Sequence, residues 1–174
     1  MATIDERLRL PSLESTRRFG VALGMVCRAG DIIAFGGDLG AGKTTLIQAV
    51  AKGAGVHADE YVCSPSFALL HEYQGHIPLY HLDLYRLRSA DEVLALGLDD
   101  YFQRDGIALV EWYDRAPELF PVETLIVRLF PHGASGRQLH LFTEGTDWQQ
   151  RIGRLLAERT WLEKGSEQKH ERSC

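Results

Sequence analysis

The first 30 residues of the chain show two hydrophobic periods in succession. Residues 4–10 predict a short extended segment, and apolar residues between 19 and 26 then recur at the spacing of one helix face. Either Ser12 or Ser15 would cap the N-terminus of this helix, and Gly30 would end it. The pattern therefore predicts an extended segment followed by a first helix.

A strand, a glycine-rich loop and a second helix follow in that order. The uninterrupted apolar run within 31–35 is bounded by glycines and is typical of a central strand buried on both faces. Residues 43–54 contain good helix formers with apolar residues on one face, and Gly53 and Gly55 would end this helix. The loop between the two elements thus joins a buried strand to a helix N-terminus.

The second half of the chain alternates short apolar segments with turns. Residues 67–73 and 77–85 predict a hairpin, and the apolar run at 107–110 predicts a second buried strand. A capping box at Ser89-Ala90-Asp91-Glu92 predicts a short helix that ends near Gly97. Residues 124–130 and 138–142 predict a second hairpin near the sheet edge. A last helix is predicted from a cap at Thr146-Asp147-Trp148-Gln149 to about residue 162.

Composition is typical of one globular domain. The 174 residues are 45% hydrophobic and 25% charged, which is average for a folded protein of ordinary type. The length suits a single core. We predict one domain over residues 1–163, followed by a polar and disordered tail over 164–174.

Charge and cysteine content limit the expected partners and location. Nineteen basic and 24 acidic residues give a net charge of -5, which argues against a broad RNA- or DNA-binding surface. Cys27, Cys63 and Cys174 have neither metal spacing nor an even disulfide set, so we expect free thiols in a reducing compartment. The first residues lack the apolar core of a signal peptide, and no apolar run is long enough to span a bilayer. We therefore expect a soluble, cytoplasmic protein without a membrane role.

The segment Gly37–Thr44 carries the strongest chemical signal. It matches the P-loop pattern G-x-x-x-x-G-K-[ST] without a mismatch. A chance match in a chain of this composition has a probability of roughly one in three hundred. Glycines let consecutive N–H groups point at phosphate oxygens, and the helix N-terminus adds positive potential. We expect a site for ATP, or a close nucleotide relative, with Mg²⁺.

Individual residues of this loop have distinct expected partners. Lys43 would reach the β- and γ-phosphates, the Thr44 hydroxyl would ligate Mg²⁺, and Thr45 would contact the α-phosphate. The predicted nucleotide-binding set also includes Asp38, Leu39, Gly40, Ala41 and Gly42. With a strand before it and a helix after it, the loop predicts an α/β fold: a single P-loop NTPase-like sheet flanked by helices, with the hairpins as antiparallel additions.

A P-loop enzyme also needs an acid on the magnesium side, usually at the end of a neighbouring strand. Glu111 follows the better apolar strand, and Asp83 lies on an alternating one. Either acid could instead be a solvated or salt-bridged carboxylate. Ser66 lies where P-loop switches place a hydroxyl that senses the γ-phosphate, although taken alone its segment indicates only a turn. These three residues are the candidates for the rest of the site.

Three histidines, His71, His76 and His81, are evenly spaced in the first predicted hairpin. A period of five fits neither one helix face nor one strand face, and carboxylates do not cluster with these residues. We interpret all three as surface residues of the hairpin and not as metal ligands.

Four linked motifs, GDLGAGKTT, SPSF, HLDLYRL and VEW, resemble the TsaE (YjeE) family in their order and separation. The resemblance covers about residues 15–137. It implies a small bacterial ATPase required for the threonylcarbamoyladenosine modification of tRNA, next to the anticodon. It also implies weak activity alone and action with the TsaB and TsaD proteins, so that tRNA would be contacted only indirectly.

The resemblance also implies roles for single residues. Gly40–Thr45 correspond to the nucleotide-binding loop, with Thr44 and Glu111 as magnesium ligands. Asp83 corresponds to an acid needed for activity, and Ser66 to the switch hydroxyl. The implied catalytic set is Lys43, Ser66, Asp83 and Glu111.

Positions at the edge of the motifs extend the implied site and include two departures from the family. Trp112 corresponds to a tryptophan beside the nucleotide, and Thr16 and Arg137 resemble flanking positions near it. Ser66 stands where the family usually has threonine; the hydroxyl is kept but a methyl group that limits its rotamers is lost. Tyr113 stands where the family often has proline or alanine. Neither departure removes a ligand.

Two other functions fit a short P-loop chain. A small-molecule kinase would need an acceptor pocket and usually an arginine-rich lid, and Arg86 and Arg88 are too few for one. A non-catalytic module, in which the nucleotide only sets affinity for a partner, is disfavoured by the presence of Asp83 and Glu111.

Overall fold

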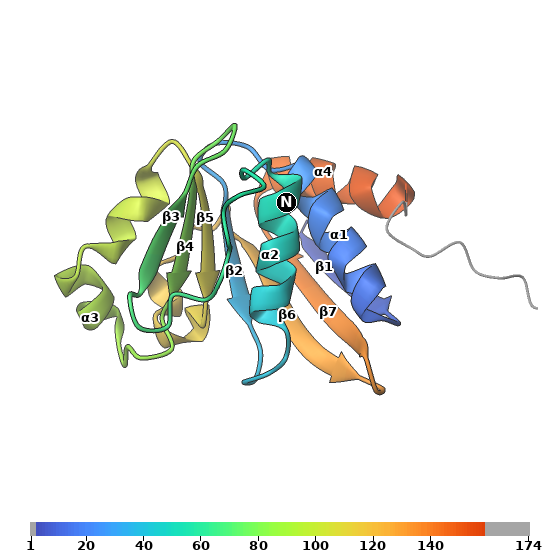
Figure 1. The fold of residues 1–174 in the computed structure, drawn as a ribbon, viewed down its shortest axis with the longest axis horizontal. Coiled ribbons are helices and arrows are strands. Elements are labelled where there is room, and N and C mark those ends of the chain that lie inside the picture. The colour runs from blue at the N-terminus through green and yellow to red at the C-terminus, as the bar shows by residue number, and fades with distance from the viewer. Residues whose placement is uncertain (1–2, 159–174) are drawn as a thin grey trace, which may run out of the picture.

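The computed structural model describes residues 3–158, where a seven-stranded sheet runs through the molecule with helices packed on it (Figure 1). The strands are β1 (Ile4–Leu10), β2 (Ile32–Gly36), β3 (Leu70–Tyr73), β4 (Leu79–Asp83), β5 (Ile107–Glu111), β6 (Leu125–His132) and β7 (Gly136–Thr143). The α-helices are α1 (Leu13–Met25), α2 (Lys43–Gly53), α3 (Ala90–Ala95) and α4 (Thr146–Glu158), and the 3-10 helices are η1 (Leu98–Gln103), η2 (Tyr113–Arg115) and η3 (Pro117–Leu119).

The sheet is parallel in its middle and antiparallel at both sides. Its strand order is β1-β7-β6-β2-β5-β4-β3, and β2 pairs in parallel with both β5 and β6, as β5 does with β4. The two predicted hairpins, β3–β4 and β6–β7, pair antiparallel, and β1 forms the edge outside β7. This confirms the predicted α/β class: a parallel P-loop-like centre with antiparallel additions.

Helix α1 begins as predicted but ends earlier than predicted. Ser12 is its N-cap and forms a capping box with Ser15. The predicted stop at Gly30 is wrong, because α1 ends at Met25. The chain leaves the helix in a turn in which Asp31 Oδ2 accepts the N–H of Arg28 at 2.6 Å.

The predicted caps of α3 and α4 also differ in detail. In α3, Glu92 Oε2 accepts the N–H of Arg88 and not that of the Ser89 cap. In α4, Thr146 is the first helical residue and not the residue before the helix. The predicted end of this helix near 162, and the boundary between domain and tail at 163–164, lie outside the described residues.

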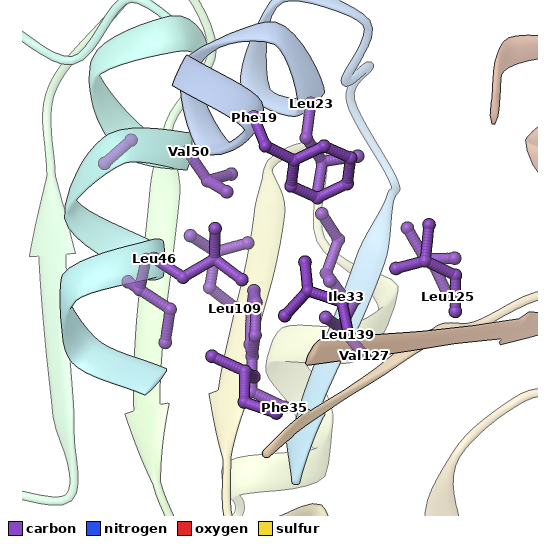
Figure 2. Close-up of a cluster of buried hydrophobic side chains, with 14 of the residues drawn as sticks. Phe19, Leu23, Ile33, Phe35, Leu46, Val50, Leu109, Leu125, Val127 and Leu139 are labelled. Carbon is purple, nitrogen blue, oxygen red and sulfur yellow. The ribbon is translucent and has the colours of Figure 1, made fainter. Parts of the chain in front are cut away.

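Alternate residues of the central strands face opposite sides of the sheet, and each side has its own core. On one side, α1 and α2 cover odd-numbered residues of the central strands (Figure 2). The labelled side chains there are Phe19, Leu23, Ile33, Phe35, Leu46, Val50, Leu109, Leu125, Val127 and Leu139. On the other side, even-numbered residues such as Leu82 and Val110 pack with Val93 of α3 and Phe102 of η1. A polar odd-numbered residue at the end of β4 or β5 therefore faces the α2 side.

Two further expectations concern thiols and membranes. Cys27 and Cys63 are free thiols, as predicted, and Cys174 lies outside the described residues. Within residues 3–158, no helix has both the length and the apolar character needed to cross a membrane.

The close packing of α1 on α2 gives a stability prediction. A Cβ atom added at Gly24 of α1 would overlap the carbonyl oxygen of Val50 in α2. We expect Gly24→Ala to lower the free energy of unfolding by about 2 kcal/mol, because the helices must separate. Gly153 of α4 is the matched control, because a Cβ there meets nothing within 4 Å. Gly153→Ala should raise stability by roughly 0.5–1 kcal/mol through helix propensity. Urea unfolding measures both changes, and equal effects would contradict the packing argument.

Candidate functional site

A cleft of about 580 Å³ lies where the P-loop meets the C-terminal ends of β4 and β5. This volume is within the range of small-molecule sites. The predicted site residues that line it are Leu39, Gly40, Gly42, Lys43, Thr44, Thr45, Ser66, Asp83, Glu111, Trp112 and Arg137. The fold therefore brings together side chains that are up to about 100 residues apart in sequence.

Strand register places the two predicted acids side by side. β4 and β5 are parallel, and their last residues, Asp83 and Glu111, are register partners. Strand β2 pairs with the other edge of β5 and ends at Gly36, directly before the P-loop. Because carboxyl ends of parallel strands meet at one edge of a sheet, both acids lie beside the loop.

The P-loop backbone needs glycine at its two ends. Gly37 has a φ of 130°, and a Cβ there would overlap the carbonyl oxygen of Leu129. Gly42, the N-cap of α2, has a φ of 103°, which side chains rarely adopt. The chain therefore enters α2 with the first N–H groups of the helix at the cleft, where they favour an anion.

Lys43 is folded back onto the loop. Its Nζ donates to the carbonyl oxygens of Gly37 at 2.6 Å and Asp38 at 3.0 Å. The same nitrogen lies 3.7 Å from the centroid of the Trp112 ring, a cation–π contact. Burial lowers the pKa of the Lys43 amine, and the negative charges of Glu111 and Asp83 oppose this shift. The ammonium group is thus held at the cleft by two backbone carbonyl oxygens and the Trp112 ring.

Glu111 joins β5 to the start of α2. Its Oε1 accepts the Thr44 hydroxyl at 2.9 Å and lies 3.0 Å from Nε2 of His81. The Glu111 side chain is almost completely buried. The two residues predicted as magnesium ligands are therefore in direct contact.

Asp83 holds the segment between α2 and β3. Its Oδ2 accepts the hydroxyls of Ser64 at 2.5 Å and Ser66 at 2.8 Å, and its Oδ1 accepts the N–H of Tyr85 at 2.9 Å. The two acids thus have different contacts: Glu111 binds the P-loop helix, and Asp83 binds the predicted switch hydroxyl.

The oxygen donors at Thr44 and Glu111 fit a magnesium ion. Among the residues that the structure describes, no group of three or more His, Cys, Asp or Glu side chains could hold a metal by itself. Mg²⁺ is hard and keeps several waters, and it is usually bound through one or two protein oxygens together with nucleotide phosphates. One hydroxyl and one carboxylate beside an anion-binding loop match that donor set.

The other predicted site residues differ in how close they come to the cleft. Arg137 is tied to the P-loop, since its Nε donates to the carbonyl oxygen of Ala41 at 2.6 Å. Asp38 contributes its carbonyl oxygen to Lys43. Thr16 is buried in α1 and its hydroxyl donates to the carbonyl oxygen of Ser12, so it is not among the residues that line the cleft.

The exit from β5 has an unusual backbone. Trp112 has a φ of 61° although it is not glycine, a conformation that costs on the order of 1 kcal/mol. Its N–H donates to the carbonyl oxygen of Phe35, which continues the β2–β5 pairing by one residue. Tyr113, the departure noted above, is buried against Gly36, and its hydroxyl accepts the Nε–H of Arg128 at 2.7 Å. The strand therefore ends in a turn that presents the Trp112 ring to Lys43.

Two contributors to the site were missed from the sequence. The interpretation of His81 as a surface residue is wrong: its exposed fraction is 0%, whereas His76 is exposed and His71 is half-buried. The available signal was the strand period, because His81 precedes Asp83 by two residues and so faces the same side. Ser64 was missed as well. It precedes Ser66 by two residues, just as His81 precedes Asp83, and the two serine hydroxyls are in contact.

Comparisons with known proteins identify the family and a similar fold. The family model described as "Threonylcarbamoyl adenosine biosynthesis protein TsaE" matches residues 10–139. The "tRNA threonylcarbamoyladenosine biosynthesis protein TsaE" of Nostoc sp. is 44% identical over 141 residues, covering 77% of this chain and 84% of that protein. The protein of the same name from Bacillus subtilis is 36% identical, covering 78% and 84%. The crystal structure of Bacillus subtilis YdiB superposes with a TM-score of 0.76 at 30% identity, covering 91% of this chain and 98% of that one.

The contacts of Asp83 predict the behaviour of the switch segment. In Asp83→Asn, one carboxylate oxygen becomes an amide that cannot accept, so the Ser64 and Ser66 hydroxyls lose a charged acceptor. We expect the free energy of unfolding to fall by about 1–3 kcal/mol and amide exchange across residues 63–69 to accelerate. Asp59→Asn is the charge-matched control, since Asp59 is exposed and does not line the cleft. Hydrogen exchange by mass spectrometry measures the effect, and unchanged protection in Asp83→Asn would contradict it.

Proposed function

This chain belongs to the TsaE family of threonylcarbamoyl adenosine biosynthesis proteins, and from that premise we propose that it is the ATP-hydrolysing component in threonylcarbamoyladenosine modification of tRNA. The names of its relatives support the pathway. One structural observation carries the proposed ATPase: the Thr44 hydroxyl donates to Glu111 within a cleft that also contains Lys43 and the α2 N-terminus. In this proposal the two oxygens bind Mg²⁺ beside a loop that binds phosphate.

The P-loop residues bind and orient the triphosphate in this proposal. Backbone N–H groups of the loop and the N-terminus of α2 attract the phosphate oxygens. Lys43 exchanges the carbonyl oxygens of Gly37 and Asp38 for phosphate oxygens, so its charge is already at the place where negative charge develops. Thr44 and Glu111 would hold Mg²⁺, which neutralises charge on the β- and γ-phosphates when bound.

Asp83 and Ser66 are proposed to link the nucleotide to the switch segment. Asp83 binds the Ser64 and Ser66 hydroxyls at the cleft wall, and Ser66 lines the cleft. A γ-phosphate that takes the Ser66 hydroxyl would release it from Asp83 and shift the segment between α2 and β3. Asp83 would then be available to orient the attacking water.

Hydrolysis by this chain alone is proposed to be slow. Of the two arginines that line the cleft, Arg137 is bound to the carbonyl oxygens of Ala41 and Gly136. The other, Arg86, is exposed and lies 5.0 Å from the centroid of the Phe67 ring. A group that stabilises the transition state would therefore come from, or be ordered by, a partner. We propose the TsaB and TsaD proteins as partners and contact with tRNA only through that assembly.

The decisive experiment measures release of inorganic phosphate from ATP, with and without TsaB and TsaD, together with the yield of modified tRNA. The proposal expects slow release alone and faster release with the partners. Transfer of phosphate only when a small-molecule acceptor is added would instead support a kinase. Nucleotide-dependent binding to the partners without turnover would support a non-catalytic module.

Replacing Glu111 gives a sharper prediction. Glu111→Gln keeps the side-chain volume but removes the charge that binds Mg²⁺, so we expect ATP turnover and tRNA modification to fall together by about 100-fold or more. Glu118→Gln is the matched control, because Glu118 is an exposed residue of η3 outside the cleft. Normal modification by folded Glu111→Gln protein would refute the proposed role of the carboxylate.

A further inference from the structure

His81 is a buried polar residue within the sheet, next to the site but outside the cleft. It lies in β4, and its register partners are Leu109 of β5 and His71 of β3. Leu79 and Asp83, two residues away on either side, share its face of the sheet. The imidazole therefore lies below the cleft floor, among residues of the apolar core.

The contact between His81 and Glu111 has a defined direction. A carboxylate oxygen can only accept, so the His81 Nε2–H donates to Glu111 Oε1 over 3.0 Å. Among the described residues, the other ring nitrogen, Nδ1, is buried without a hydrogen-bond partner. A ring that carries its one hydrogen on Nε2 satisfies this contact and leaves no N–H group buried without an acceptor. Within residues 3–158, the hydrogen bond to Glu111 is the only one that the ring makes.

This single contact fixes an oxygen that already has another role. Glu111 Oε1 also accepts the Thr44 hydroxyl at 2.9 Å, so two donors from β4 and α2 hold the same oxygen. Without the His81 donor from β4, Thr44 would be the one remaining hydrogen-bond donor to this oxygen among the described residues, and Thr44 is itself a proposed magnesium ligand. An apolar side chain would fill the core at position 81 without burying an unpaired nitrogen, so packing alone gives no reason for a histidine there.

We propose that His81 is a positioning residue, which holds the Glu111 carboxylate against Thr44 and thereby sets the affinity of the site for the divalent cation. The inference rests on the proposed function, since it assumes that Thr44 and Glu111 bind a metal together with nucleotide. Partners that orient a metal ligand from behind are typically worth about 10- to 100-fold in metal affinity. His81 itself touches neither nucleotide nor metal in this proposal.

Three substitutions separate positioning from packing. The amide of Gln overlays the Nε2 position of histidine, so His81→Gln keeps a donor to Glu111. The amide of Asn is one methylene shorter and overlays Nδ1, so His81→Asn keeps polarity but loses that donor. His81→Leu removes every polar atom. The Gln and Asn variants are a pair matched in chemistry that differ only in reach.

The probe is Mn²⁺ in the presence of a non-hydrolysable ATP analogue, with free Mn²⁺ measured by electron paramagnetic resonance. We expect Mn²⁺ to bind about 10- to 100-fold more weakly in His81→Asn and His81→Leu, and within about threefold of the wild type in His81→Gln. When EDTA removes the metal, the affinity for the ATP analogue should be unchanged in all three variants, because the P-loop and α2 are intact. In a Glu111→Gln background, His81→Leu should have no further effect on Mn²⁺ binding.

The outcomes distinguish the inference from the proposed function. Wild-type Mn²⁺ affinity in folded Asn and Leu variants overturns the inference and leaves the proposed function intact. Equal losses in the Gln and Asn variants also overturn it, because packing would then explain the effect. Failure of the wild type to bind Mn²⁺ with the analogue refutes both. Thermal melting checks folding, and should His81→Leu not fold, the Gln and Asn pair decides.

Discussion

The hydrogen bond from Thr44 to Glu111 is the contact on which the rest of the cleft depends. It connects the first turn of α2 to the last residue of β5, and so links the P-loop to the central sheet. The contact is possible only because β2 and β5 are parallel neighbours and both end at the same edge. Strand alternation then directs Glu111, Asp83 and His81 toward α2, with the apolar residues of that face beneath them.

Buried charge is only partly compensated within this small group, which keeps an excess of one negative charge. Lys43 carries one positive charge, and Asp83 and Glu111 carry two negative charges, all three side chains being buried. Each charge has its own partners. Lys43 donates to two carbonyl oxygens and lies over the Trp112 ring, and the two acids accept hydrogen bonds from hydroxyl and N–H groups. Paired and hydrogen-bonded charges can remain buried, whereas an isolated one would shift its pKa or leave the core. An incoming triphosphate adds negative charge to this group, which is why a divalent cation fits the proposed chemistry.

The sequence predicted features that are encoded locally and missed those that arise from packing. The P-loop, the strand before it and the helix after it occupy one continuous segment, and Glu111 ends a short apolar run that can be recognised by itself. The burial of His81 could not be seen from the even spacing of three histidines, because it depends on β5 lying beside β4 and on α2 packing over that face of the sheet. Two other missed features also involve contacts outside the local pattern: beyond the early end of α1, Asp31 accepts the N–H of Arg28, and at the αL turn Trp112 donates to Phe35. Neither could be seen in local propensity.

The folded-back position of Lys43 has a consequence for how tightly any anion can be held. In the free protein, the Gly37 and Asp38 carbonyl oxygens act as an internal competitor for the ammonium group, present at a fixed and high effective concentration. The binding free energy that a phosphate would gain from Lys43 is therefore only the difference between the hydrogen bonds to phosphate and those to the two carbonyl oxygens. When the phosphate leaves, the lysine regains these carbonyl partners. In the proposed function, such self-competition would lower ground-state affinity and ease product release, which suits repeated cycles of binding and not permanent retention of a nucleotide.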